Sequence, residues 1–240
     1  MTTQTAASAV VLVHGAWHAP WHWHEVAARL TARRLIVETV DLPSCRPERG
    51  DLYDDSAAIR SALDRYDDAV LVAHSYGGIP ATDAAADHPA VRRIVYLSAY
   101  MADVGESLGG FEPPADEPNI HPQTDLEMVD EQTMVMKPDR AAEVLFHDCP
   151  DPEAAVEHLR GMNPAVLAQS PKSVGWQGKP STYVMTTDDR ATAVSVQRGL
   201  SRRADDVYEI TSGHSSFLAR PDEVSEIVLG AAGMPADRVR

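Results

Sequence analysis

The chain has 240 residues, two cysteines and a formal net charge of −15. This charge opposes binding to nucleic acid or to anionic membranes, because both need basic patches on their protein partners. No stretch of eighteen apolar residues occurs, which predicts that nothing spans a membrane. The length suits one domain, residues 1–240, with enough chain to bury a core.

The cysteines and the N-terminus indicate a compartment. Cys45 and Cys149 lie in dissimilar proline-flanked contexts. A disulfide between them is an alternative, but two free thiols in a reducing cytoplasm fit better. Residues 1–8 lack a basic region and a long apolar core, so we expect no secretory signal. We therefore expect a cytoplasmic protein, and the sequence leaves open whether it forms a homodimer.

Strands and helices alternate through the first hundred residues. The expected strands are 10–13, 35–40, 69–73 and 93–99, and the expected helices are 21–32, 56–65 and 77–86. This order predicts an α/β fold with a doubly wound, mostly parallel sheet of about six strands.

The pattern changes between residues 101 and 180, where prolines are frequent and no clear strand is predicted. Helical pieces are expected at 139–146 and 152–160. An irregular insertion between two sheet strands is typical of a cap over an active site, here a helical one. Its apolar side chains mostly pack the cap onto the sheet, and a few face substrate. The expected pocket residues, within and beside this insertion, are Trp17, His18, Met136, Phe146, Trp176 and Phe217.

The sheet pattern resumes with strands at 181–186 and 207–210 and a last helix at 221–229. The first of these strands is followed by Asp188 and Asp189, and the second by His214. In an open parallel sheet, such residues lie at the edge where ligands bind.

The segment around Ser75 is the most informative motif. An apolar run, Val70-Leu71-Val72-Ala73, is followed by His74-Ser75-Tyr76-Gly77-Gly78. This is the small-x-Ser-x-small form of the nucleophile elbow, in which a serine on a tight strand-to-helix turn needs small neighbours two residues away. An ordinary strand-to-helix turn is the alternative. The strand at 10–13 ends in His14-Gly15-Ala16-Trp17, and Gly15 permits the backbone to turn there.

Together these motifs predict a catalytic triad. Ser75 would be the nucleophile, His214 the base, and Asp189 the acid that orients it, with Asp188 as a competitor. The backbone N–H groups of Ala16 and Tyr76 would form the oxyanion hole.

Several other residues near these motifs invite a functional interpretation. A metal site is an alternative at the histidines near the N-terminus, but His24-Glu25 lacks the second histidine of H-E-x-x-H, so we expect no metal. His18 either contacts an acyl oxygen or bonds within its loop. His74 is expected to pack structurally, and the Tyr76 ring is a candidate for the pocket wall.

The chain resembles α/β-hydrolases of the branch that holds plant methylesterases, hydroxynitrile lyases and bacterial esterases. The similarity covers nearly the whole chain and rests on residues 13–18 with 21–23, 73–78, 183–190 and 213–218. The branch's T-x-E-D segment aligns with the segment ending at Asp189, which favours Asp189 over Asp188. The lyases of this branch carry a threonine where this chain has Gly15 and a lysine where it has Ser215. The resemblance therefore implies ester hydrolysis rather than cyanohydrin cleavage.

The expected function is therefore hydrolysis of a small or medium carboxylic ester through an acyl-enzyme, without a cofactor. Cyclisation or elimination chemistry on a secondary metabolite in the same pocket is one alternative, because fold does not determine reaction. A catalytically silent small-molecule binding protein is the other.

Overall fold

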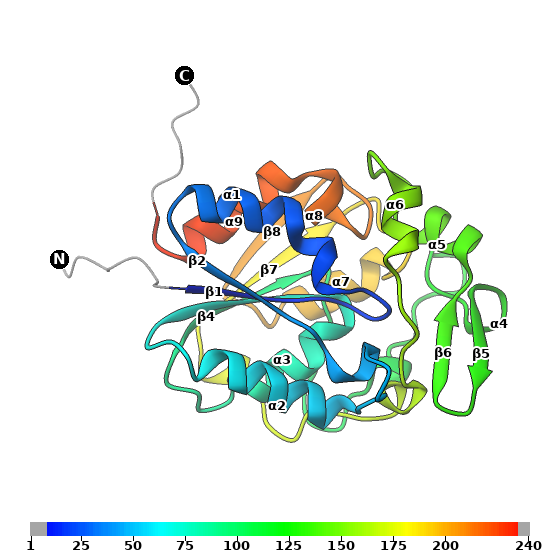
Figure 1. Ribbon diagram of the computed structural model, residues 1–240, viewed down its shortest axis with the longest axis horizontal. Helices are drawn as coiled ribbons and strands as arrows, with labels where there is room; N and C mark the ends of the chain where they lie inside the picture. The colour runs from blue at the N-terminus through cyan, green and yellow to red at the C-terminus, as the bar shows by residue number, and fades with distance from the viewer. Residues whose placement is uncertain (1–8, 235–240) are drawn as a thin grey trace.

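Six parallel strands form one twisted sheet, in the order β2-β1-β3-β4-β7-β8 (Figure 1). The structure is a computed structural model and describes residues 9–234. Residues 1–8, where we expect no secretory signal, lie outside the described residues. The prediction of a doubly wound parallel sheet is confirmed. Its strands are β1 (Ala9–Val13), β2 (Ile36–Val40), β3 (Ala69–His74), β4 (Val91–Leu97), β7 (Ser181–Thr186) and β8 (Asp206–Ile210).

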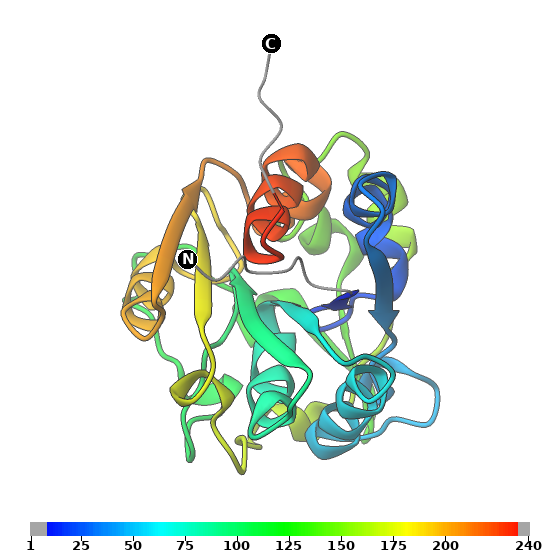
Figure 2. The ribbon, with the colours of Figure 1, turned by 90° about the vertical axis from the view of Figure 1, so that its left-hand side faces the viewer.

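Helices cover both faces of this sheet (Figures 1 and 2). Every residue of β1 and β3 is buried, because a parallel strand in the middle of a sheet is covered on both sides. One face carries α1 (His24–Ala32), α8 (Ser216–Ala219) and α9 (Pro221–Ala231), the other carries α2 (Leu52–Leu63) and α3 (Gly78–Ala85), and α7 (Val194–Ser201) packs against β7.

Helix α2 begins four residues before the predicted start at Ser56. The Asp51 carboxylate accepts hydrogen bonds from the backbone N–H groups of Tyr53 and Asp54, at 2.8 and 3.2 Å. The Asp54 side chain accepts a bond from the Asp51 N–H in return, at 2.9 Å. This reciprocal cap satisfies N–H groups that the helix itself cannot, so the helix starts at Leu52.

The insertion at residues 101–180, called the cap below, contains a β-hairpin, so the prediction that it has no clear strand is wrong. Strand β5 (Leu126–Asp130) pairs antiparallel with β6 (Thr133–Met136). Most of β5 is exposed, and an exposed strand lacks the apolar alternation that marks strands in sequence. The short helices of the cap are α4 (Pro122–Asp125), α5 (Pro138–Val144) and α6 (Pro152–Glu157).

The cap stands at the carboxyl ends of the sheet strands, on the right in Figure 1. The loops that leave β1, β3, β7 and β8 meet at this edge because the strands are parallel. Among residues 9–234, no helix is long and apolar enough to cross a bilayer.

Candidate active site

Ser75 occupies a strained turn between β3 and α3. Its φ of 51° lies in the left-handed region, which costs a side-chain-bearing residue about 1–3 kcal/mol. A Cβ on Gly77 would lie 2.4 Å from the backbone oxygen of His14, and one on Gly78 would lie 2.7 Å from that of Tyr100. Both glycines are therefore required by the close packing of the turn, and Gly77 is the small residue that the small-x-Ser-x-small pattern places two positions after the serine.

The loop after β1 lies directly against this turn. A Cβ on Gly15 would come within 2.8 Å of both the Ser75 Cβ and the His74 Nδ1. The positive φ of this loop is at Trp17, at 61°, and not at Gly15. Gly15 is thus needed for close approach, which corrects the expectation that it makes the turn. Ala16 and Ser75 line the same cavity.

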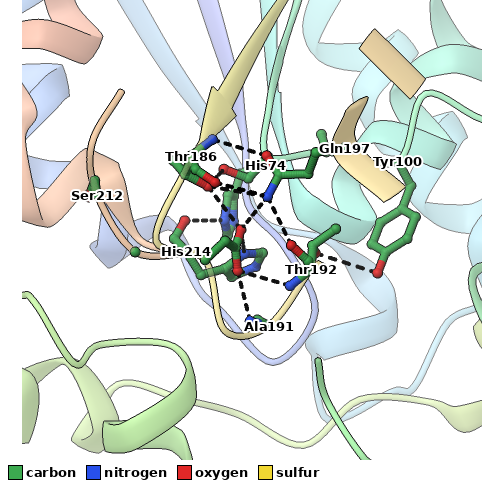
Figure 3. Close-up of polar contacts among 12 residues, drawn as sticks. His74, Tyr100, Thr186, Ala191, Thr192, Gln197, Ser212 and His214 are labelled. Atoms are coloured by element: carbon green, nitrogen blue, oxygen red, sulfur yellow. Dashed lines mark hydrogen bonds and ion pairs between the residues drawn. The ribbon is translucent and has the colours of Figure 1, made fainter. Parts of the chain in front are cut away.

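Asp189 and His214 are in direct contact, with the His214 Nδ1 2.8 Å from the Asp189 Oδ2. The other partners of this buried carboxylate surround it (Figure 3). They are the N–H groups of Ala191 and Thr192 on Oδ1, at 2.8 and 2.9 Å, and the Thr186 hydroxyl and Gln197 amide on Oδ2, both at 2.9 Å. A carboxylate held in this way can fix both the orientation and the tautomer of a histidine.

Asp188 lies apart from His214. Its side chain is exposed, and its backbone N–H donates to the Ser212 oxygen at 3.1 Å. Of the two candidate acids, only Asp189 contacts the histidine in the described residues.

His74 joins the serine turn to the histidine loop. Its Nε2 lies 3.1 Å from the backbone oxygen of His214, and the two rings are 4.5 Å apart between centroids. Burial, and then the neighbouring His214, hold the pKa of His74 well below its usual value. His74 is therefore neutral and donates to that oxygen, in line with the expected packing role.

His18 bonds within its own loop. Its Nδ1 is 2.7 Å from the Ala16 oxygen, and burial lowers its pKa well below the ordinary value. The other histidines of this region also meet backbone oxygens: His14 that of Gly15, His22 that of Ala155, and His24 that of Trp21. Within residues 9–234, no cluster of three His, Cys, Asp or Glu side chains is arranged to hold a metal.

The Tyr76 ring does not line the pocket, contrary to expectation. It is fully buried, and its hydroxyl donates to the Asp55 Oδ2 at 2.7 Å. The second Asp55 oxygen accepts from the Ser44 N–H at 2.8 Å. Burial raises the pKa of Asp55 to about 6. The side chain of Tyr76 thus anchors the serine turn to Asp55 of α2. The backbone N–H of Tyr76 follows directly after Ser75 in this turn.

A cavity of about 520 Å³ opens above Ser75. Of the six expected pocket residues, only Trp17 lines it. Phe146 and Phe217 are buried around His18, with ring centroids 5.6 and 5.9 Å from it. Met136 is also buried, and Trp176 donates its indole N–H to the Ala102 oxygen at 3.0 Å.

Sequence reasoning missed most of the cavity wall, which comes from the segment after β4, the start of the cap and the loop before α7. The missed lining residues include Tyr100, Leu108, Phe111, Ile120, His121, Leu126, Leu167, Ala191 and Thr192. Their positions in the chain could have indicated some of these residues. Tyr100 follows the carboxyl end of β4, and Thr192 follows the candidate acid Asp189.

A serine on this strained turn, beside the carboxyl ends of β7 and β8, defines the class of α/β-hydrolases. The sequence pattern described as "Alpha/beta hydrolase family" matches residues 10–227, and the chain belongs to that family.

Its relatives place it in the methylesterase-like branch. The chain is 30% identical to Alpha/beta hydrolase nvfD of Aspergillus novofumigatus over 94% of this chain and 96% of the relative. It is 28% identical to Methylesterase 7 of Arabidopsis thaliana, over 92% and 95%. The crystal structure of polyneuridine aldehyde esterase superposes with a TM-score of 0.79 at 25% identity, covering 95% of this chain and 99% of that one. Of the three just described, the two that are named for an activity, Methylesterase 7 and polyneuridine aldehyde esterase, are esterases.

Proposed function

We propose that this protein hydrolyses carboxylic esters through a Ser75–His214–Asp189 triad. The observation that carries the proposal is the Asp189–His214 contact of 2.8 Å, beside a serine on a strained turn. His74 supports it, because the residue before the serine bonds to the backbone of the histidine.

The proposed mechanism has two halves. His214 takes the Ser75 hydroxyl proton as the oxygen attacks the ester carbonyl carbon, and the N–H groups of Ala16 and Tyr76 stabilise the oxyanion. When the intermediate collapses, the carbon–oxygen bond to the alcohol breaks and His214 protonates the leaving alcohol. Water, deprotonated by His214, then attacks the acyl-enzyme and releases the acid. No step requires a cofactor.

The cavity favours a neutral and largely apolar ester. Trp17, Leu108, Phe111, Ile120 and other apolar side chains supply most of its wall. No lysine or arginine is among its lining residues, so no permanently charged side chain there would neutralise a substrate carboxylate. A volume of about 520 Å³ fits a small or medium organic molecule.

We also propose that the enzyme works in the cytoplasm. Cys45 and Cys149 are both free and buried, which suits a reducing compartment.

The test is a panel of neutral nitrophenyl and methyl esters of graded acyl size. Ser75→Ala should fold normally and lose at least about a thousandfold in kcat/KM on the best substrate. Ser170→Ala is the matched control, because the recorded bond of Ser170 is made by its backbone oxygen. Near-native turnover by Ser75→Ala would refute the triad. Mass spectrometry of a trapped acyl group on Ser75 separates a hydrolase from a silent binder, and product analysis separates hydrolysis from rearrangement.

A further inference from the structure

Three successive cap residues contact the loop that carries His214. The Asp148 Oδ2 accepts hydrogen bonds from the Ser212 hydroxyl and from the Gly213 N–H, both at 2.8 Å. The Cys149 thiol lies 3.8 Å from the Ser215 oxygen. A Cβ on Gly213 would lie 2.4 Å from the Cε1 of His147, so a larger residue there would have to displace the His147 ring.

Asp148 has a distinctive place among the contacts of this loop. Within residues 9–234, its carboxylate is the side-chain acceptor that bonds residues 212–213, through the Ser212 hydroxyl and the Gly213 N–H. The remaining bond of Ser212 runs from the Asp188 N–H to its backbone oxygen, at 3.1 Å. His214 itself is held at its ring by Asp189 and at its backbone oxygen by His74. The chain just before the histidine is therefore anchored through the cap.

A later stretch of the cap, residues 155–160, reaches the loop after β1. The Arg160 N–H donates to the Trp17 oxygen at 2.7 Å, and the His22 Nε2 lies 3.1 Å from the Ala155 oxygen. The cap thus touches the loop of the candidate base and the loop of the candidate oxyanion donor at once.

We propose that Asp148 is a positioning residue through which the cap holds His214 in the place needed to deprotonate Ser75. The inference rests on the proposed hydrolase function. A catalytic base must stay within hydrogen-bond reach of its nucleophile, and a displacement of about 1 Å can cost about a hundredfold in rate. Asp148 would act on the chemical step through the loop, without touching substrate.

The experiment compares Asp148→Ala, Asp148→Asn, Ser212→Ala and the Asp148→Ala/Ser212→Ala double variant on the best neutral ester. Asp148→Ala should lower kcat about ten- to a hundredfold and change KM less than about threefold. Asp148→Asn should recover most of the loss, because its amide oxygen can accept both bonds. Ser212→Ala should lower kcat less than Asp148→Ala does, since the Gly213 bond remains. The double variant should be no slower than Asp148→Ala, because the Ser212 hydroxyl acts through that carboxylate.

Asp151→Ala is the matched control. Asp151 lies three residues along the cap and caps α6 by accepting from the Ala154 N–H at 3.0 Å. The Asp151→Ala substitution should loosen the start of α6 and leave kcat within about twofold of wild type. An N-cap side chain at an exposed helix end contributes only about 1 kcal/mol of stability. An equal fall in kcat in Asp151→Ala would overturn the proposal in favour of general loosening of the cap. A folded Asp148→Ala variant with wild-type kcat, or an Asn variant as slow as the Ala variant, would overturn it too.

Labelling of Ser75 by a fluorophosphonate separates this proposal from the function beneath it. Wild-type protein that resists labelling would contradict the hydrolase function. Wild-type labelling together with equally fast labelling of Asp148→Ala would contradict only the positioning role. If Asp148→Ala does not fold, the Asp148→Asn and Ser212→Ala variants carry the test. The fluorophosphonate should then label Ser75 more slowly in Ser212→Ala than in wild type. An unchanged labelling rate would overturn the proposal.

Discussion

At the scale of the residue, the site depends on two residues whose backbone φ angle is positive, Ser75 and Trp17. They lie on the two loops that meet at the sheet edge, and Gly15 lets those loops approach to contact distance. Such strain persists only where the surrounding structure enforces it, and it concentrates at functional sites. Here the enforcing contacts include the bond from the Tyr100 N–H to the Ser75 oxygen, at 3.1 Å.

The two neighbouring aspartates should respond very differently to substitution. Asp189→Asn should lower kcat/KM by at least about a hundredfold, because an amide can favour the wrong histidine tautomer and leaves the imidazolium without its counter-charge. Asp188→Asn, exposed and away from His214, should change it less than about threefold. Steady-state kinetics on one ester, with circular dichroism to verify folding, make the comparison. Equal or reversed effects would mean that the acid is assigned wrongly.

The pH dependence should report one histidine. Burial keeps the pKa values of His18 and His74 well below the usual range, so both stay neutral at assay pH. A histidine base works only when it is unprotonated. We therefore expect kcat/KM to rise with pH as the base loses its proton, and then to level off. A profile that is flat from pH 5 to 9, measured in buffers of constant ionic strength, would contradict a histidine base.

At the scale of the element, α2 supports the serine turn from below. Asp55 on α2 accepts from the Tyr76 hydroxyl, so the helix and the turn share a buried carboxylate. The capping box at Asp51 determines where α2 begins. The start of the helix is thus set by local side chains, whereas the burial of Asp55 depends on how the helix packs.

This buried carboxylate should make folding depend on pH. The pKa of Asp55 is raised to about 6 in the folded protein, above the value of about 3.9 expected when unfolded. The folded state therefore binds the proton more tightly, and stability rises as the pH falls from above 6 to below 4. Relative to Asp55→Asn, which cannot titrate, wild type should gain up to about 3 kcal/mol over that range. Urea unfolding of both proteins at pH 4, 5.5 and 7 measures the difference, and parallel pH dependences would contradict it.

At the scale of the whole molecule, charge and cavity both disfavour cyanide chemistry. The chain carries a net charge of −15, and no lysine or arginine lines the cavity above Ser75. Ser215 is buried and uncharged at the position where the lyases that the chain resembles carry lysine. The cavity wall therefore offers a departing cyanide no lysine or arginine to stabilise it.

We expect no significant cleavage of mandelonitrile or acetone cyanohydrin by protein that hydrolyses esters. Cyanide release is measured against the buffer rate, with Ser75→Ala as the control. Efficient release that depends on Ser75 would place the lyase function ahead of the esterase function.

The sequence by itself determined the order of the six sheet strands, the family and the tight turn at Ser75. These features depend on neighbours in the chain: apolar runs form buried strands, and a strained serine needs small residues two positions away. The hairpin of β5 and β6 escaped prediction because its exposed residues lack that patterning. Helix α7 escaped too, since Gly199 and β-branched valines weaken its local helix signal.

Only the tertiary structure decided which side chains meet. Asp188 and Asp189 are adjacent in sequence, yet the packing of α7 and the loop after β8 surrounds only the second with donors. Phe146 and Phe217 carry the apolar character expected of a pocket, but they pack in the core around His18. The contact of Asp148 with Gly213 joins segments 65 residues apart. Such contacts depend on how distant segments pack, which local patterns in the sequence do not encode.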